Sequence, residues 1–202
     1  GATVTMNNVS GQIAASNVPV LNGGATLNLL GANSLAGLAF NNNGGGAPTV
    51  NATPTAGGLL TLTGNITADS SNMSTTSVLS GGVDLGLATR TFTINPITVN
   101  GVDVAPLQAA LAITAGLRGT GVGIIKTGAG VLGLNAVNSY TGATTVSIGT
   151  LQIGAAGAGA PQSALTLAGG TILNMNGLSG VFGSLAGAGT VTNSSGTAGT
   201  LT

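Results

Sequence analysis

The sequence predicts an all-β protein: a single right-handed parallel β-solenoid, with Gly/Asn-rich turns, over residues 1–202. Three observations lead to this prediction. Short segments have an apolar residue at every second position, clusters of Gly, Asn and Ser separate them, and the segments recur at steps near twenty residues. The hydrophobic fraction of 43% provides an apolar core, whereas the charged fraction of 3% leaves a surface of Thr, Ser, Asn and Gly.

The alternating segments identify the strands. In each of them two large apolar residues flank one small or polar residue, which is the pattern of a strand with one buried face. The five clearest pairs are Leu27/Leu29, Leu60/Leu62, Leu132/Leu134, Leu151/Ile153 and Leu173/Met175.

Clusters of Gly, Asn and Ser mark the turns, at residues 41–46, 81–83, 154–160 and 193–196. Glycine adopts positive φ at low cost and is therefore common in turns. The step from Leu132 to Leu151 and the step from Leu151 to Leu173 are both near twenty, which suits one coil of a parallel solenoid per step. We expect about nine coils, which at roughly 4.8 Å each give a rod about 45 Å long.

The segment 102–117 follows this pattern least well. Leu107 and Leu111 have helical spacing, but Leu111 and Ile113 alternate as in a strand. Thr114 and Gly116 disfavour a long helix. We expect a short loop or helical turn near Pro106, followed by a strand.

An internal repeat is visible in the chain. The segment LNGGATLNL at Leu21–Leu29 matches LAGGTILNM at Leu167–Met175, and SLAG follows both copies, at Ser34–Gly37 and at Ser184–Gly187. The spacer before SLAG is slightly longer in the second copy, as expected for a repeat whose loops vary in length. We therefore predict one solenoid domain over residues 1–202, with related repeat units at 21–45 and 167–196.

The most regular unit is GVGIIKTGAGVLGLNAVNSYTGATTVSIGTLQIG, residues 121–154. It resembles the autotransporter-associated β-strand repeat of secreted passenger domains, in which a Lys and two Gly precede an L-x-L pair, followed by N-x-Y-x-G, T-x-V and G-T-L. The matching positions are Lys126, Gly128, Gly130, Leu132, Leu134, Asn138, Tyr140, Gly142, Thr145, Gly149, Thr150 and Leu151. The resemblance implies a solenoid that is extracellular or on the surface of a Gram-negative-type bacterium.

Two enzymatic motifs overlap this unit. Gly128, Gly130 and Gly133 spell the G-x-G-x-x-G of dinucleotide-binding folds, but Leu132 and Leu134 continue a strand and no acidic residue follows. Lys126 opens a K-T-G as in penicillin-binding enzymes, but it is the only lysine, so the partner motif S-x-x-K is impossible. Both spellings are interpreted as turn glycines beside a strand.

The ionisable residues are too few for most catalytic sites. They are Asp69, Asp84, Asp103, Arg90, Arg118 and Lys126, with no Glu, His or Cys. The sequence therefore predicts no catalytic residue, no metal site, no cofactor and, because the net charge is zero, no nucleic-acid partner. Asp84 and Asp103 are one coil length apart and could share a site if they stack, but binding turn amides is the simpler role. No apolar run is long enough to span a membrane.

The function that this sequence favours is structural: a non-enzymatic extracellular subunit that stacks head to tail into a fibre by β-strand augmentation. Neither end of the chain offers a capping element, and no charged residue precedes Asp69 or follows Lys126. The expected partner is therefore a second copy of the chain, and the expected contact residues are Thr3, Thr5, Thr200 and Thr202.

Two alternatives stay open. The chain could be part of a surface-displayed autotransporter passenger or adhesin that binds a host or glycan surface, with residues 41–57 as the expected contact loop. It could also be an ice-binding solenoid, because Thr-x-Thr pairs flank an apolar residue at Thr3/Thr5, Thr61/Thr63, Thr91/Thr93, Thr190/Thr192 and Thr200/Thr202. The sequons at Asn8, Asn65, Asn72 and Asn193 leave glycosylation open as well.

Overall fold

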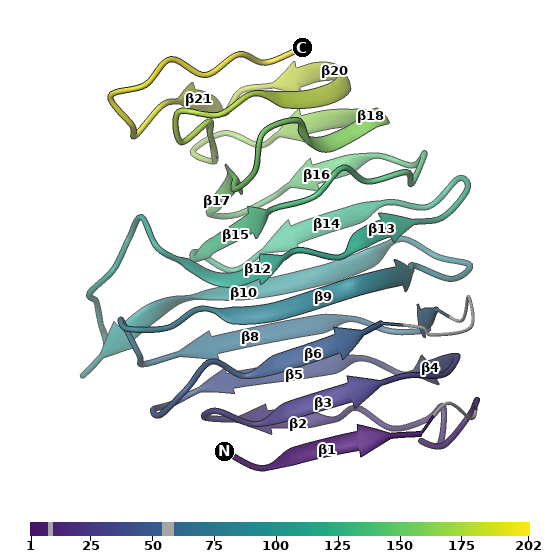
Figure 1. Cartoon of the computed structure of the whole chain (residues 1–202). Helices are drawn as coiled ribbons and strands as arrows, with labels where there is room; N and C mark the ends of the chain where they lie inside the picture. The colour runs from purple at the N-terminus through teal and green to yellow at the C-terminus, as the bar shows by residue number, and fades with distance from the viewer. Residues whose placement is uncertain (8–9, 54–58) are drawn as a thin grey trace.

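The computed structural model describes residues 1–7, 10–53 and 59–202. Within these ranges all regular secondary structure is β and no helix is present, which confirms the prediction of an all-β chain. The strands stack into a column that rises from β1 near the N-terminus to β20 and β21 near the C-terminus (Figure 1).

The strands form two sheets. The path of the first sheet is β1 (Thr3–Met6), β3 (Thr26–Leu29), β6 (Thr49–Ala52), β9 (Ser77–Asp84), β12 (Ala109–Ile113), β15 (Val131–Leu134), β17 (Thr150–Ile153), β19 (Ile172–Asn174) and β21 (Thr190–Thr192). Three shorter strands, β4 (Asn33–Leu35), β7 (Leu60–Leu62) and β13 (Gly116–Arg118), extend this sheet to one side.

The second sheet runs β2 (Val20–Asn22), β5 (Leu38–Asn42), β8 (Ile66–Ser70), β10 (Arg90–Val99), β14 (Ile124–Thr127), β16 (Thr144–Val146), β18 (Ala158–Leu167) and β20 (Gly180–Gly187). All strand pairs in both paths are parallel. The exception lies outside the paths, where β11 (Val102–Asp103) folds back on β10 as an antiparallel hairpin.

The chain passes back and forth between the two sheets, so successive coils add strands alternately to the path of the first sheet and to the path of the second. Leu132, Leu151 and Leu173 are direct register partners on neighbouring strands. The two steps near twenty that these leucines define are therefore single coils, as predicted. This parallel arrangement is consistent with a β-solenoid, and the handedness of its coils stays a prediction.

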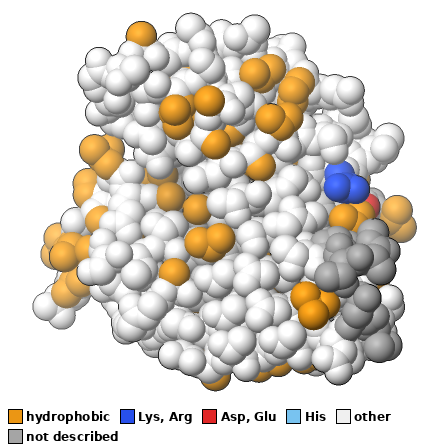
Figure 2. Space-filling model, in the orientation of Figure 1, with side chains coloured by type: hydrophobic (Ala, Val, Ile, Leu, Met, Phe, Trp, Pro, Cys, Tyr) orange, Lys and Arg blue, Asp and Glu red, His pale blue; other side chains and the backbone are white. Residues whose placement is uncertain are grey.

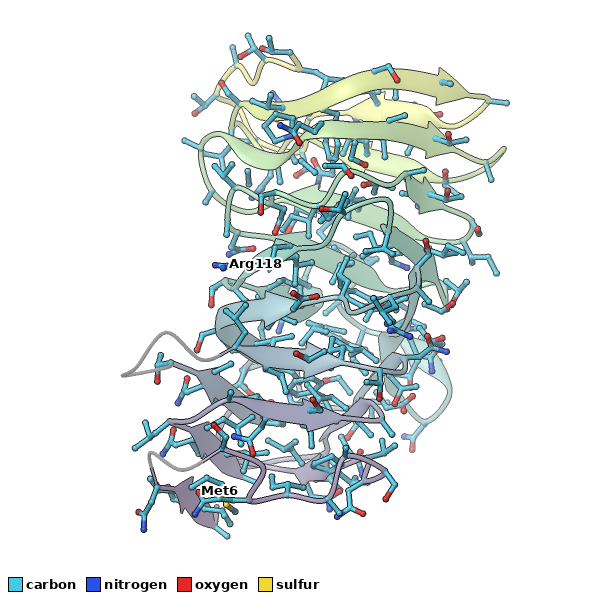
Figure 3. All side chains as sticks on the ribbon, turned by 90° about the vertical axis from the view of Figure 1, so that its right-hand side faces the viewer. Met6 and Arg118 are labelled. Carbon is cyan, nitrogen blue, oxygen red and sulfur yellow. The ribbon has the colours of Figure 1, made fainter. Side chains whose placement is uncertain are left out.

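The core consists of aliphatic rows that run along the column axis. One row contains Leu27, Val50 and Leu79 in register, each at most 7% exposed. Side chains from the facing sheet fill the other side of the interior, as the stick view shows along the whole column (Figure 3). Both residues of every alternating pair named above are buried, which confirms the predicted faces.

The segment 102–117 contains the predicted strand but no helix. A turn at Pro106 and Leu107 leads into β12, and β13 follows after a break at Thr114 and Ala115. Leu107 is 64% exposed, so it does not join Leu111 on a buried helical face. The helical spacing was therefore coincidental.

The surface is polar and nearly uncharged. Most of the face in Figure 2 is white, with one basic group beside a small acidic patch at the edge. Within the described residues no helix is long and apolar enough to cross a membrane.

Candidate functional site

The only lysine of the chain lies inside the solenoid. Lys126 is on β14 in register with Phe92 below it and Val146 above it, and all three side chains are fully buried. The alternation of the strand puts position 126 on the inward face together with Ile124. A cationic side chain thus stands between two apolar side chains of an interior row, so its amine needs polar partners.

Backbone carbonyls supply these partners. The Nζ of Lys126 donates hydrogen bonds to the carbonyl oxygens of Thr127 at 3.0 Å, Gly128 at 2.6 Å and Ile148 at 2.9 Å. Three acceptors match the three donors of an ammonium group. Burial lowers the pKa of Lys126 to about 8, because the interior disfavours the charged form. The lysine therefore ties the corner after β14 to the next coil.

Gly149 completes this corner, which we call the lysine corner: Lys126, Thr127, Gly128, Ile148 and Gly149. Its φ of +81° lies in the left-handed region. A Cβ at this position would lie 2.5 Å from the Gly128 oxygen and 2.8 Å from the Lys126 Nζ. Because no side chain fits there, Gly149 is required where the two coils close on the amine.

A second polar contact set lies one turn further along the repeat. Asn138 is buried, accepts a hydrogen bond from the Leu117 amide at 2.9 Å and donates to the carbonyls of Ala136 at 3.1 Å and Gly159 at 2.8 Å. It thereby links three successive coils. An inward Asn that satisfies turn backbone is the structural role expected for this position in a solenoid.

Tyr140 is also fully buried. Its hydroxyl is 2.6 Å from that of Thr144, which is 2.8 Å from the hydroxyl of Ser163. Burial raises the pKa of Tyr140 to about 12, despite the opposing effect of these hydrogen bonds. The phenol is therefore a neutral member of a closed hydroxyl chain.

The remaining positions of the repeat belong to its framework. The three leucines lie in the core, Gly130 is buried, and Gly142 and Thr145 are half-buried. These are Leu132, Leu134, Leu151, Gly130, Gly142 and Thr145. The strand β15 follows Gly130 directly, as expected for a turn and not for a dinucleotide-binding loop.

The same unit is recognised by comparison with known protein families. Residues 124–153 match the family model named passenger-associated-transport-repeat. This chain carries such a repeat. A search among curated proteins and a search among solved structures gave no match.

The matched residues of the passenger-associated-transport-repeat contain the lysine corner, Asn138 and Tyr140. The side chains of Lys126, Asn138 and Tyr140 use their hydrogen-bonding groups on backbone carbonyls and a neighbouring hydroxyl. These three residues therefore help to join coils to one another, and their buried side chains are not available to a ligand at the surface.

Asp84 and Asp103 do not stack. Asp84 lies at the end of β9 in register with Arg118, whereas Asp103 pairs with Thr98 in the hairpin. Each accepts a hydrogen bond from a nearby turn amide, Asp84 from Gly86 at 2.7 Å and Asp103 from Ala105 at 3.1 Å. The simpler role was therefore correct. Among the described residues no group of three or more His, Cys, Asp or Glu could hold a metal.

Arg90 is a buried cation that the sequence reasoning did not single out. It is 8% exposed and donates to the carbonyls of Leu85 at 2.7 Å and Thr63 at 2.8 Å. A signal was present, because Arg90 alternates with Phe92 and Ile94 on the inward face of β10. Arg118, in contrast, projects from the side of the column (Figure 3).

The Thr-x-Thr pairs do not share one face. Thr91/Thr93 belongs to the second sheet, whereas Thr61/Thr63 starts on β7 of the first. The residues between the threonines of the first and fourth pairs are also not buried, since Val4 is 46% and Val191 is 42% exposed. Both lie close to the ends of the column, on β1 and β21.

The expected contact loop at residues 41–57 is partly regular structure. β5 extends to Asn42 and β6 occupies Thr49–Ala52, so the intervening loop is short. Residues 54–57 lie outside the described residues, as does the sequon asparagine Asn8. Asn65 and Asn193 are exposed and Asn72 is half-buried.

Proposed function

We propose that this chain is a non-enzymatic structural module of an extracellular or cell-surface passenger, and that its coils continue from one subunit to the next, head to tail, in a fibre. The passenger-associated-transport-repeat supports the passenger context. The observation that carries the assembly is that aliphatic core rows emerge at both ends of the column.

At the N-terminal end, Val4 stands in the row of Leu27 and Val50. Val4 is 46% exposed, whereas Leu27 is 7% and Val50 is fully buried. A hollow of about 310 Å³ opens there, lined almost entirely by apolar residues: Ala2, Val4, Met6, Ile13, Pro19, Val20, Leu21, Ala25, Thr26 and Leu27. Met6 marks this lowest coil in Figure 3.

The C-terminal end is similar. Val191 on β21 is 42% exposed and Leu185 on β20 is 48% exposed, although their register partners Leu173 and Leu165 are fully buried. The residues after β21 add one bridge, Leu201 to Gly180, and the Thr202 amide donates to the Gly180 carbonyl. This bridge covers only the start of β20.

A second copy of the chain suits these ends better than another protein does. Each end presents parallel strand edges and aliphatic side chains spaced as in the core rows, and no charged residue precedes Asp69 or follows Lys126. If the edge strands of one end pair with the edge strands of the other, the parallel sheets and the aliphatic rows both continue across the junction, and no charged side chain is buried. Because the two ends differ, the contact is heterologous and does not close.

The test uses two blocking variants and a matched control. Val4→Lys places a charge at the N-terminal end and Val191→Lys places one at the C-terminal end. Val102→Lys adds the same charge to the hairpin, where Val102 is 63% exposed. Light scattering after size exclusion, with electron microscopy, measures the assembly of each.

We expect filaments from the parent chain and the hairpin variant, and monomers from either end variant alone. An equimolar mixture of the two end variants should stop at dimers, because one compatible pair of ends is left. A parent chain that stays monomeric at high concentration, or end variants that still polymerise, would refute head-to-tail assembly.

A further inference from the structure

The outer face of the second sheet carries a row of amide and carboxylate side chains. Asn22, Asn41 and Asp69 are register partners on β2, β5 and β8. Asn95 continues the row on β10, where the register shifts between Ile94 and Ile97. The Asn95 Nδ2 reaches the Asp69 Oδ1 at 2.7 Å across this bulge.

The hydrogen bonds along this row have a direction. The Nδ2 of Asn41 donates to the Oδ1 of Asn22 at 2.8 Å, as Asn95 donates to Asp69. The Nδ2 of each of these two asparagines thus donates to a side-chain oxygen on the preceding coil. The carboxylate of Asp69 has no hydrogen to donate in the same way. Within the described part of the chain no hydrogen bond joins the side chains of Asn41 and Asp69, so the row is broken at this step.

Asn41 and Asp69 are direct register partners, so two acceptors, the Oδ1 of Asn41 and the second carboxylate oxygen of Asp69, belong to neighbouring strands at the break. A groove of about 410 Å³ lies at the same place. Its lining consists of Asn41, Asp69, Ser70, Ser71, Asn95, Pro96 and Thr98. Pockets for small ligands usually measure about 300–1,000 Å³, so the groove is large enough for a small polar molecule.

The residues that line the groove determine which class of molecule it can bind. Among its residues no cation is present, so an anion has no counter-charge. With one carboxylate the lining offers little negative charge to a calcium ion, whose affinity depends on the number of charged oxygen ligands. Hydroxyl groups suit the site instead, because each can donate to one of the acceptors, while the Pro96 ring offers an apolar surface.

We propose that this groove binds one sugar ring of a neutral polysaccharide, with hydroxyl groups that donate to Asp69 and Asn41. The ligand would complete the broken row by supplying the missing donors. The groove is on a lateral face of the column, so this site is independent of head-to-tail assembly, and failure of either proposal leaves the other standing.

The decisive variant is Asp69→Asn. An amide at position 69 can donate to the Oδ1 of Asn41, so it closes the row from within and removes the carboxylate acceptor. The thermal midpoint should stay the same or rise, while affinity for the sugar should fall at least tenfold. Asp84→Asn is the control, because it makes the same charge change on β9, away from the groove.

Binding is measured by isothermal titration calorimetry with neutral hexasaccharides of glucose, mannose, galactose and xylose as probes. Binding to the parent and to Asp84→Asn, lost in a folded Asp69→Asn, supports the site. The proposal is overturned if no probe binds the parent chain, if Asp69→Asn binds as well as the parent, or if binding requires added calcium.

Discussion

Replacement of Gly149 by alanine tests whether the lysine corner is closed as tightly as the structure indicates. The residue has a φ of +81°, and an added Cβ would lie 2.5 Å from the Gly128 oxygen and 2.7 Å from the Gly130 oxygen. Both are backbone atoms, so relief requires the two coils to separate. The same separation would disturb the hydrogen bonds from the Lys126 amine to its carbonyl acceptors.

Two effects add in this variant. A left-handed backbone costs a non-glycine residue about 1–2 kcal/mol. Overpacking of a filled site costs about 1–3 kcal/mol more. We therefore expect Gly149→Ala to lower the free energy of unfolding by about 2–5 kcal/mol, or the melting temperature by roughly 4–20 °C for a domain of this size.

Gly157→Ala is the matched control. Gly157 has a similar φ of +74°, but no atom lies within 4 Å of an added Cβ. This variant isolates the backbone cost of about 1–2 kcal/mol. Urea denaturation followed by far-ultraviolet circular dichroism compares the two. Equal losses of stability would show that the corner around Lys126 is not closely packed.

Three further predictions follow from the core and its buried titratable groups. Leu132→Asp should lower the free energy of unfolding by more than about 4 kcal/mol or prevent folding, because Leu132 is fully buried. Gln152→Lys, on the outer face, should change it by less than about 0.5 kcal/mol in the same urea melts. Similar losses in the two variants would mean that the inner and outer faces are inverted. The pKa of Lys126 falls from 10.5 to about 8 on folding, so the folded state binds fewer protons between these values, and the urea midpoint should rise with pH from 8 to 10, but not in Lys126→Met. The pKa of Tyr140 rises from 10.0 to about 12 on folding, so this phenol contributes stability that is present below pH 10 and is lost as the pH rises towards 12. Tyr140→Phe should therefore lose less stability than the parent chain between pH 10 and 12. The same pH profile in both proteins would contradict this prediction.

The alternation of inward and outward positions along each strand could be predicted from sequence, and this alternation already places the two buried cations on inward positions. Lys126 follows Ile124 at the second position, and Arg90 precedes Phe92 in the same way, so both stand on inward positions. The sequence could not show what satisfies them. Their acceptors are backbone carbonyls at corners, and for Lys126 one of these, Ile148, lies 22 residues away.

The outer side-chain rows could not be predicted for a different reason. Asn28 bonds Asn51 across 23 residues and Asn51 bonds Ser80 across 29, because the loops between coils differ in length. Spacing alone therefore does not align side chains on neighbouring coils. The repeated SLAG shows the same limit, since its first copy enters β4 of the first sheet and its second lies in β20 of the second.

The most direct test of head-to-tail assembly is a helical reconstruction of filaments of the parent chain by electron cryo-microscopy. Nine strands follow one another along the path of the first sheet. At about 4.8 Å per coil, a continuous junction gives an axial rise of roughly 43 Å per subunit, with strand pairing unbroken from β21 of one copy to β1 of the next. Filaments built by lateral contacts, or a rise that leaves the two end coils unpaired, would contradict the account.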